Sequence, residues 1–493
     1  MKSIWMKKRL AAVVIAVSLL QLTACGETDS GADAGEGSSS SAAASDEEIA
    51  EGGSAAESSS AENAGEGGSS AKEGREAEGT EGEEPWVNPY TMPDSLKSEE
   101  DIVNARNYIW EEHLNQVRSD ETRAAELEGQ AMTFGEATMK YGFSVKGEPD
   151  ENGYPLYIAL HGGGGSDTPD LNDDQWQQMM TYYQTSVVNG IYVNPRGVRD
   201  TWDCHFNPES YPLYDRLIEN LIAFYDVDPN RVYLMGFSAG GDGVYGITSK
   251  MADRFAAANM SAGHPNGLSL WNLYNMPLLI QVGELDDAYD RNVIDAQYGL
   301  LLDEYHETLG GGYEHAAYIH KDKGHNFSDN GDGNQRVIED IAGWLETGES
   351  PVIEVDTNAV RFLEQYVRDP LPERVVWDFT QRADERQGAS FYWLQADKRR
   401  KDGMIVASYD KETNSINVEQ CSVSGKVTFL LNNDMLDLFA PITVNTPDGN
   451  STEMTVTPDI DLLYETTEER GDYNYQFAAK ITIDFREMEK TEE

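Results

Sequence analysis

The residue best suited to chemistry in this sequence is a serine between two glycines. Gly236-Phe237-Ser238-Ala239-Gly240 has the pattern G-x-S-x-G and stands between the apolar run Arg231–Met235 and a helical pattern. In that context the glycines allow a sharp turn that exposes the serine as a nucleophile. The amide of Ala239 then lies at a helix N-terminus, where it can face a developing oxyanion. The segment therefore predicts acyl transfer through Ser238.

A second glycine-rich segment, His161-Gly162-Gly163-Gly164-Gly165, follows the apolar run Leu156–Leu160. Glycines let the backbone approach a ligand closely and point N–H groups at it. The alternatives are a flexible loop or a phosphate cradle, but a cradle would normally carry a lysine nearby, as in G-K-[ST]. We interpret Gly163 and Gly164 as donors to an oxyanion. His161 is interpreted as a hydrogen-bonded loop residue and not as a catalytic base.

An activated serine needs a base, and the base needs an acid that orients it. Gly283-Glu284-Leu285-Asp286-Asp287 follows the apolar run Leu278–Val282, and the pattern Gly-x-x-Asp selects Asp286, with Asp287 and Glu284 as competitors. Of the eight histidines, His325 stands on a loop of suitable length after the last predicted strand, with His320 second. The order Ser, Asp, His agrees with this choice.

Three further residues are weaker candidates for substrate contact, because each stands on a loop after a predicted strand. Arg196 either forms an ion pair under its loop or contacts substrate. Trp202 is either a stacking platform for a sugar or aromatic acyl group, or the lid of a hydrophobic core. His264 is interpreted as lining the pocket. Three other residues are weaker candidates still. The Asp242 carboxylate is interpreted as favouring the N-terminus of its helix. Tyr289 and Arg291 flank the acid loop.

The elements that must position these residues alternate between strand and helix. Six runs predict strands: Leu156–Leu160, Gly190–Asn194, Arg231–Met235, Phe255–Met260, Leu278–Val282 and His315–Ile319. Helical patterns span 173–187, 211–225, 240–251, 290–308 and 332–345, and an amphipathic pattern precedes them over 95–115. Such alternation predicts a doubly wound, mostly parallel sheet, with the chemistry at the carboxyl ends of its strands.

The pattern changes after Trp344. Eight short runs predict strands: Val375–Trp377, Ser390–Leu394, Met404–Tyr409, Ser415–Glu419, Lys426–Leu431, Ile442–Asn445, Glu453–Thr457 and Phe477–Asp484. We find no long helical pattern there, so we expect a small all-β, sandwich-like domain after the α/β domain. The predicted boundaries are 86–350 for the α/β domain with a helical lead-in, and 351–493 for the β-rich domain. The aromatic residues near 377 and 391–393 are expected to be core.

Composition limits the partners. The 493 residues include 37 Lys and Arg against 88 Asp and Glu, which gives a net charge of −51. Such a chain cannot neutralise phosphates, so nucleic acid is not an expected partner. Three cysteines exclude a disulfide scaffold, and their spacing predicts no metal site. Cys204 and Cys421 are expected to be unpaired thiols, although a bond between them remains an alternative.

The first 25 residues have the form of a targeting segment. Lys7, Lys8 and Arg9 precede an apolar run from Leu10 to Leu20, which predicts a signal peptide. Leu22-Thr23-Ala24-Cys25 resembles a bacterial lipobox, which implies cleavage before Cys25, lipidation of its thiol, and membrane attachment through lipid only. Residues 26–85 are mostly Gly, Ala, Ser and Glu, and predict a disordered acidic tether.

From about residue 130 to 347 the chain resembles the α/β-hydrolase superfamily. The segments Leu160–Gly164, Asn194–Gly197, Gly236–Gly241 and Gly324–Phe327 are most similar to those of polyhydroxybutyrate-depolymerase-type and feruloyl-type esterases. They also resemble the catalytic domain of prolyl-oligopeptidase-family peptidases. The resemblance implies hydrolysis without metal or cofactor. We expect an extracellular, membrane-anchored esterase acting on a carbohydrate or polyester ester; the alternatives are a serine peptidase and a binding lipoprotein that has lost catalysis.

Overall fold

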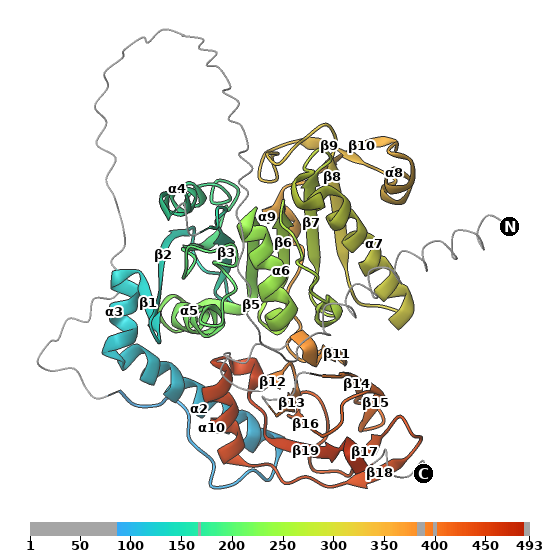
Figure 1. Ribbon diagram of the computed structural model, residues 1–493. Helices are drawn as coiled ribbons and strands as arrows, with labels where there is room; N and C mark the ends of the chain where they lie inside the picture. The colour runs from blue at the N-terminus through green and yellow to red at the C-terminus, as the bar shows by residue number, and fades with distance from the viewer. Residues whose placement is uncertain (1–85, 166–168, 382–389, 398–401, 488–493) are drawn as a thin grey trace, which may run out of the picture. The chain divides into compact units, whose positions relative to one another are not determined.

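The structure is a computed structural model that describes residues 86–165, 169–381, 390–397 and 402–487 (Figure 1). The predicted signal peptide, the lipidation site Cys25 and the tether over 26–85 lie outside the described residues. Within the described ranges, no helix is both long enough and apolar enough to cross a membrane. The elements described below all belong to the unit from Asn88 to Glu493.

A ten-stranded sheet has the order β1-β2-β4-β3-β5-β6-β7-β8-β9-β10. Its central strands from β3 to β8 are parallel, and β1, β2, β9 and β10 run antiparallel at the two edges. The six predicted strands correspond to β3 through β8. The bounds are β1 Ala131–Phe134, β2 Ala137–Lys146, β3 Tyr154–Leu160, β4 Gly190–Pro195, β5 Val227–Phe237, β6 Ala257–Ser261, β7 Leu278–Gly283, β8 His315–His320, β9 Asn334–Ile338 and β10 Val352–Asp356.

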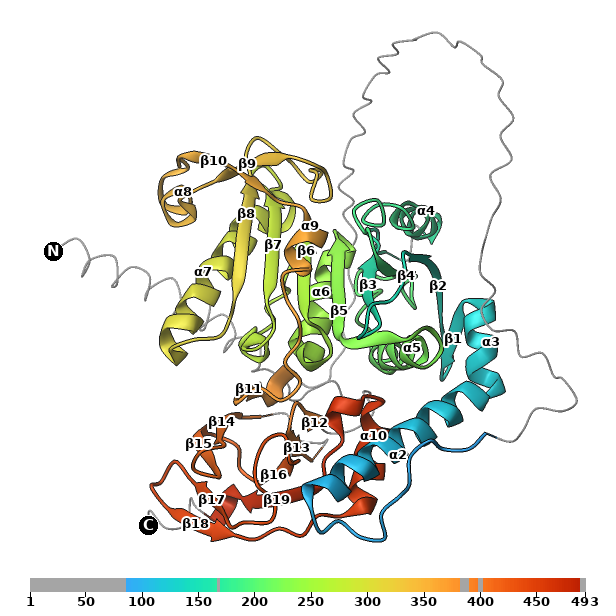
Figure 2. The same cartoon turned by 180° about the vertical axis from the view of Figure 1, so that it is seen from behind.

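Helices cover both faces of this sheet (Figures 1 and 2). Alternate residues of β3 point to opposite faces: Leu156 and Ile158 join the core beneath α5 and α6, whereas Tyr157 and Ala159 join the core beneath α4 and α9. The helices are α4 Pro169–Met179, α5 Ser210–Tyr225, α6 Ala239–Met251, α7 Arg291–Leu309, α8 Ile341–Thr347 and α9 Ala359–Leu363. The predicted doubly wound sheet is confirmed.

Two predicted helices differ from the observed ones. The pattern over 173–187 corresponds to α4, which lies earlier, at Pro169–Met179. The helix predicted over 332–345 is wrong in its first half, because Asn334–Ile338 forms strand β9 and pairs with β10. Val337 and Ile338 are buried there, and the Asp340 side chain caps the shorter helix α8 by accepting from the Gly343 N–H. The large sheet thus continues to Asp356, beyond the boundary drawn at residue 350.

The C-terminal part contains two small sheets, ordered β11-β14-β15-β17-β18 and β12-β13-β16-β19. The aromatic residues Trp377, Phe391 and Trp393 are buried, as expected for core. The strands are β11 Arg374–Asp378, β12 Ser390–Phe391, β13 Leu394–Ala396, β14 Met404–Asp410, β15 Ser415–Cys421, β16 Lys426–Leu431, β17 Ile442–Asn445, β18 Ser451–Met454 and β19 Ala479–Asp484. Cys204 and Cys421 are both free thiols.

The expectation that the C-terminal part is all-β is wrong, because it contains helix α10, Ile460–Arg470. Asp459 caps its first turn, and Gly471 ends it in the left-handed conformation. Its buried side includes Thr466 and Thr467, whose hydroxyls hydrogen-bond to carbonyls of the same helix. Threonines in place of apolar residues hide the helical periodicity in the sequence.

The helical lead-in consists of α2, Glu99–Ser119, and α3, Glu121–Gly129. Helix α2 runs beside α10 in both views (Figures 1 and 2). The Tyr464 hydroxyl donates to Glu112 at 2.8 Å, and Arg106 donates to Asp434 at 2.6 Å. On another side of α2, the Arg118 guanidinium donates to the Ala223 carbonyl of α5 at 2.6 Å. The two lead-in helices therefore contact both the domain of the large sheet and the C-terminal part.

A cluster of buried charges joins these parts at the amino ends of β5 and β6; we call it the charged seam. It comprises Asp253 and Arg254, which precede β6, with Arg368, Arg470 and Asp472. Asp472 binds Arg368 at 2.6 Å and Arg254 at 3.6 Å, and Asp253 binds Arg470 at 2.5 Å. All five side chains are at most 4% exposed. Each carboxylate of the charged seam is therefore matched by arginine.

Candidate active site

Ser238 occupies a strained turn between β5 and α6. Its φ of 59° and ψ of −122° lie in a region that residues with a side chain rarely adopt. A Cβ on Gly236 would lie 2.2 Å from the carbonyl oxygen of Gly240, and a Cβ on Gly240 would lie 2.2 Å from that of Leu160. Both positions of the motif therefore need glycine, because the backbone closes tightly around the serine.

His325 and Asp286 stand in line with this serine. The His325 Nε2 lies 3.0 Å from the Ser238 Oγ, and its Nδ1 lies 2.8 Å from the Asp286 Oδ2. In the tautomer suited to catalysis, Nδ1–H donates to the carboxylate and Nε2 accepts the serine hydroxyl. The Asp286 side chain is 2% exposed, whereas the His325 side chain is 37% exposed. The structure thus brings the three predicted residues together, with the acid buried and the base accessible.

The competing residues are engaged elsewhere. Glu284 binds Lys321 at 2.5 Å and accepts from the Asp322 N–H, and Asp287 is exposed. His320 lies 2.9 Å from the Gln281 side chain and is buried, and burial lowers its pKa to about 4. Within the described residues, Glu284, Asp287 and His320 form no hydrogen bond with Ser238 or His325. The geometry therefore favours Asp286 and His325 over their competitors.

The glycine loop lies directly against the serine. A Cβ on Gly162 would lie 3.3 Å from the Ser238 Cβ, and Gly163 has a φ of 105° that suits glycine. The two predicted donors differ, however. The Gly164 N–H donates to the Asn172 side chain at 2.6 Å and is therefore already engaged. Among the predicted donors, this leaves Gly163 and Ala239, the first residue of α6, as the pair suited to an oxyanion.

His161 has a structural role. Its Nδ1 lies 2.6 Å from the Gly162 carbonyl, and its Nε2 accepts the Gly197 N–H at 3.0 Å. The ring is fully buried, and burial lowers its pKa to about 4. A neutral ring with both nitrogens occupied cannot serve as a base, so His161 fixes the glycine loop to the loop after β4.

The three weaker candidates have different surroundings. Arg196 binds Asp173 at 2.8 Å and Asp200 at 2.5 Å, and its side chain is 13% exposed, which favours the ion-pair interpretation. Trp202 is 55% exposed, so it is not the lid of a core. Its Cα would lie 3.0 Å from a Cβ on Gly164, which places it beside the glycine loop. His264 is partly buried, and burial lowers its pKa.

The loop after β6 is held by Asp242, one turn into α6. Asp242 Oδ1 accepts the His264 N–H at 2.7 Å, and Asn266 donates to its other oxygen at 3.4 Å. Burial raises the pKa of Asp242 to about 6. Through these hydrogen bonds Asp242 connects α6 to the loop after β6.

A buried polar network supports the loop that carries His325. The Asp329 carboxylate accepts hydrogen bonds from Tyr183 at 2.6 Å, from Tyr182 at 2.8 Å and from Ser261. Asp329 is fully buried, and burial raises its pKa. No pattern in the sequence predicts this network or the contact of Asn172 with the glycine loop. Their partners are far apart in the chain, so no local spacing could reveal them.

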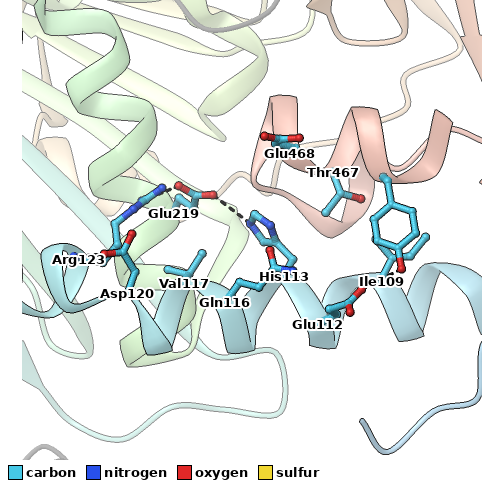
Figure 3. A pocket seen from close by; sticks show the side chains of 11 residues that line it. Ile109, Glu112, His113, Gln116, Val117, Asp120, Arg123, Glu219, Thr467 and Glu468 are labelled. Atoms are coloured by element: carbon cyan, nitrogen blue, oxygen red, sulfur yellow. Dashed lines mark hydrogen bonds and ion pairs between the residues drawn. The ribbon is translucent and has the colours of Figure 1, made fainter. Parts of the chain in front are cut away.

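A cavity of about 460 Å³ lies apart from the triad, between α2, α5 and α10 (Figure 3). His113 and Arg123 both bind Glu219, at 3.0 and 2.6 Å. The lining is Ile109, Glu112, His113, Gln116, Val117, Asp120, Arg123, Glu219, Tyr464, Thr467 and Glu468. It contains no triad residue. Within the described parts of the chain, no group of three or more His, Cys, Asp or Glu side chains is arranged to hold a metal ion.

The sheet order and the strand–turn–helix around Ser238 define an α/β-hydrolase fold. No protein-family model matches the chain. Over 157 residues the chain is 28% identical to the bifunctional acetylxylan esterase/xylanase XynS20E of Neocallimastix patriciarum. The match covers 31% of this chain and 22% of that protein, so the chain spans about a fifth of this relative's length.

Solved structures overlap with the chain at low TM-scores. A thermostable esterase is 20% identical and has a TM-score of 0.31, with 48% of this chain and 62% of that chain covered. The poly(3-hydroxybutyrate) depolymerase LpqC of Bordetella parapertussis is 15% identical with a TM-score of 0.31, and covers 46% of this chain and 88% of its own. The fold assignment therefore rests on the sheet order and the serine turn described above.

Proposed function

We propose that the chain is a serine hydrolase that cleaves carboxylic esters. The observation that carries the proposal is the hydrogen-bonded line from Ser238 through His325 to Asp286, built on a strained turn. The 28% identical relative, which is named as a bifunctional acetylxylan esterase/xylanase, supports ester hydrolysis. A strained backbone at a nucleophile is retained where function requires it.

In the proposed reaction, Ser238 Oγ attacks the ester carbonyl carbon while His325 Nε2 takes the hydroxyl proton. The tetrahedral oxyanion would be held by the N–H groups of Gly163 and Ala239. Collapse breaks the bond to the alcohol, which leaves with the proton from His325. Water then attacks the acyl-enzyme with the same base, and releases the acid and free Ser238. Asp286 stabilises the imidazolium formed in each half.

We further propose an ester of a carbohydrate or polyester as the substrate. The exposed ring of Trp202 beside the glycine loop supports a contact with a sugar or an aromatic acyl group. From the lipobox-like segment ending at Cys25, we propose that the mature chain is lipid-anchored on the extracytoplasmic face of the membrane. Mass spectrometry of the mature N-terminus tests the anchor, and an unmodified Cys25 would exclude it.

The test is labelling of the full chain with a fluorophosphonate probe. Wild type should be labelled and Ser238→Ala should not, because the probe traps an activated serine. Ser328→Ala is the control, since Ser328 is an exposed serine near His325 in sequence, and it should label normally. A wild-type chain that folds but is not labelled would refute the hydrolase proposal and favour a binding role.

A panel of p-nitrophenyl esters and proline-containing peptide amides then separates the two hydrolase classes. An esterase should turn over the short esters and leave the amides intact. Cleavage of the amides at comparable kcat/KM would replace the esterase with a serine peptidase. Acetylated xylan and poly(3-hydroxybutyrate) then separate the carbohydrate from the polyester substrate.

A further inference from the structure

We propose that Arg291 is a positioning residue for Asp286, and that its charge sets the pH below which His325 ceases to act as a base. The inference rests on the proposed function. Arg291 opens α7, immediately after the acid loop, and stands five positions from Asp286 in the sequence. A serine, a histidine and an aspartate suffice for the triad, so the arginine is an addition to it.

The geometry places the guanidinium on the free side of the acid. Arg291 Nη1 lies 3.5 Å from Asp286 Oδ1, while the other oxygen, Oδ2, holds His325 at 2.8 Å. The guanidinium also reaches the Ala288 carbonyl at 3.4 Å and lies 5.0 Å from the centre of the Tyr289 ring. The Arg291 side chain is 14% exposed and that of Asp286 is 2% exposed. Their interaction is therefore weakly screened by solvent.

The same arginine faces two further acids. Asp242 approaches from α6 and Asp295 from the second turn of α7, and Arg291 lowers the pKa of both against the opposing effect of burial. Burial prevails in each case, because it raises the pKa of Asp242 to about 6 and that of Asp295 well above its usual value. Asp295 is fully buried and hydrogen-bonded to Tyr245 at 3.1 Å. Arg291 thus offsets negative charge where three carboxyl groups converge.

The remaining titratable groups around the triad are paired, neutral or exposed. Glu284 is paired with Lys321, and His320 is buried and neutral near pH 7. His264, from the loop after β6, also interacts with Arg291, and burial lowers its pKa. The other charged neighbours lie on exposed parts of the acid and base loops, namely Asp287, Asp290, Asp322 and Lys323. Arg291 is therefore the partly buried cation that acts directly on Asp286.

The direction of the effect follows from charge. The negative charge of Asp286 favours the protonated form of His325. The positive charge of Arg291, which lies beside the same carboxylate, disfavours that form. Removal of the guanidinium should stabilise the imidazolium, so that a higher pH is needed to free the base. With an effective dielectric constant near 20, one charge within about 10 Å changes a protonation equilibrium by about one pH unit.

The experiment measures kcat/KM for p-nitrophenyl acetate against pH. In Arg291→Gln the acid limb of the pH profile of kcat/KM should move to higher pH by about one unit. Arg291→Lys should reverse at least half of this shift. Arg199→Gln is the matched control, because it removes an arginine paired with Glu209 on a different loop. Its acid limb should coincide with that of wild type. An unshifted profile in folded Arg291→Gln would overturn the proposal.

Two further measurements keep the test decisive. If Arg291→Gln fails to fold, Tyr289→Ala removes the ring beside the guanidinium at a position that is 77% exposed. It should shift the limb in the same direction by about 0.3 pH unit, and no shift would count against the proposal. The NMR titration midpoint of the His325 ring should follow the same order without any turnover. That readout separates failure of the Arg291 proposal from failure of the proposed function.

Discussion

The two ends of the large sheet hold buried charge in opposite ways. At the amino ends of β5 and β6, the charged seam sets two aspartates against three arginines. At the carboxyl ends, Asp242, Asp286 and Asp295 converge on Arg291. Burial would raise the pKa of Asp472 in the charged seam, but Arg368 and Arg254 outweigh it and hold the pKa below its usual value. For Asp242 burial prevails, and the pKa rises to about 6.

This difference separates assembly from chemistry. Matched charges hold parts of a chain together, and removal of one partner leaves an uncompensated ion in the interior. Unmatched carboxyl groups cost stability, but they provide groups that can exchange protons near neutral pH. We therefore expect variants of the charged seam to unfold the protein with little effect on the chemistry, and variants at the triad to do the reverse.

The largest effect should come from Asp286→Asn. The amide keeps the shape of the acid but favours the wrong histidine tautomer, so kcat should fall about 10³- to 10⁴-fold. The midpoint of urea unfolding should change little. Steady-state kinetics beside urea denaturation checks both parts, with the exposed neighbour Asp287→Asn as the control. If activity fell only in proportion to the fraction of folded protein, the proposed difference between the two ends of the large sheet would be contradicted.

Asp472→Ala should act in the opposite way. It removes the carboxylate that binds Arg368, whereas Arg254 keeps its ion pair with Asp215 at 3.0 Å, and it should lower the free energy of unfolding by about 3–5 kcal/mol. The kcat of the fraction that remains folded should stay near the wild-type value. Asp484→Ala, which removes the ion-pair partner of the exposed Arg486, should leave the unfolding curve unchanged. Equal effects of the two variants would show that the charged seam does not hold the parts together.

Asp242→Asn tests the carboxyl end of the sheet through the pH dependence of protein stability. The pKa of Asp242 is about 6 when folded and about 3.9 when unfolded, so its contribution to stability is complete below about pH 4 and is lost as pH rises through 6. Relative to wild type, the amide variant should gain about 1–3 kcal/mol between pH 4 and pH 8. Urea unfolding at both values measures this, with the exposed Asp170→Asn as the control.

The charged seam should show the opposite dependence. Because the pKa of Asp472 is depressed, its contribution to stability is present above about pH 4 and is lost as pH falls further.

A gain for Asp242→Asn that is the same at pH 4 and pH 8 would contradict the assigned ionisation of Asp242.

The smallest effect should come from Trp202→Ala. Loss of an exposed ring beside the glycine loop should raise KM for an acetylated oligosaccharide about 3- to 10-fold with kcat unchanged, because a ring contact contributes about 1 kcal/mol. Turnover of p-nitrophenyl acetate should not change. Phe439→Ala removes another exposed aromatic ring, in the C-terminal part, and should change neither substrate. A parallel loss on both esters would remove Trp202 from substrate binding.

The sequence predicted the features that local pattern controls. The six central strands were recognised because parallel strands buried on both faces are continuous apolar runs. Ser238, Asp286 and His325 could be selected because each follows such a run, and the structure places them within hydrogen-bond reach. Motifs of this kind are specified by a few neighbouring residues, and do not depend on the rest of the chain.

The features that were missed depend on partners far along the chain. The Gly164 amide is engaged by Asn172, which stands just before the predicted helix. The charged seam joins Arg254 to Asp472 across more than two hundred positions, and no spacing could indicate this pair. The sequence predicts a helix at β9 because Val337 and Ile338 also fit a helical period when β10 is not considered.

The contact between α2 and α10 also has a consequence for synthesis. Ile102, Ile109 and Val117 form the buried side of α2, and this helix emerges from the ribosome about 350 residues before α10 is complete. At 5–20 residues per second, the interval is roughly 20–70 seconds. Throughout that time the apolar side of α2 lacks one of its two final neighbours. Nascent chains stalled before residue 460 should therefore expose α2 to protease, and full-length chains should protect it.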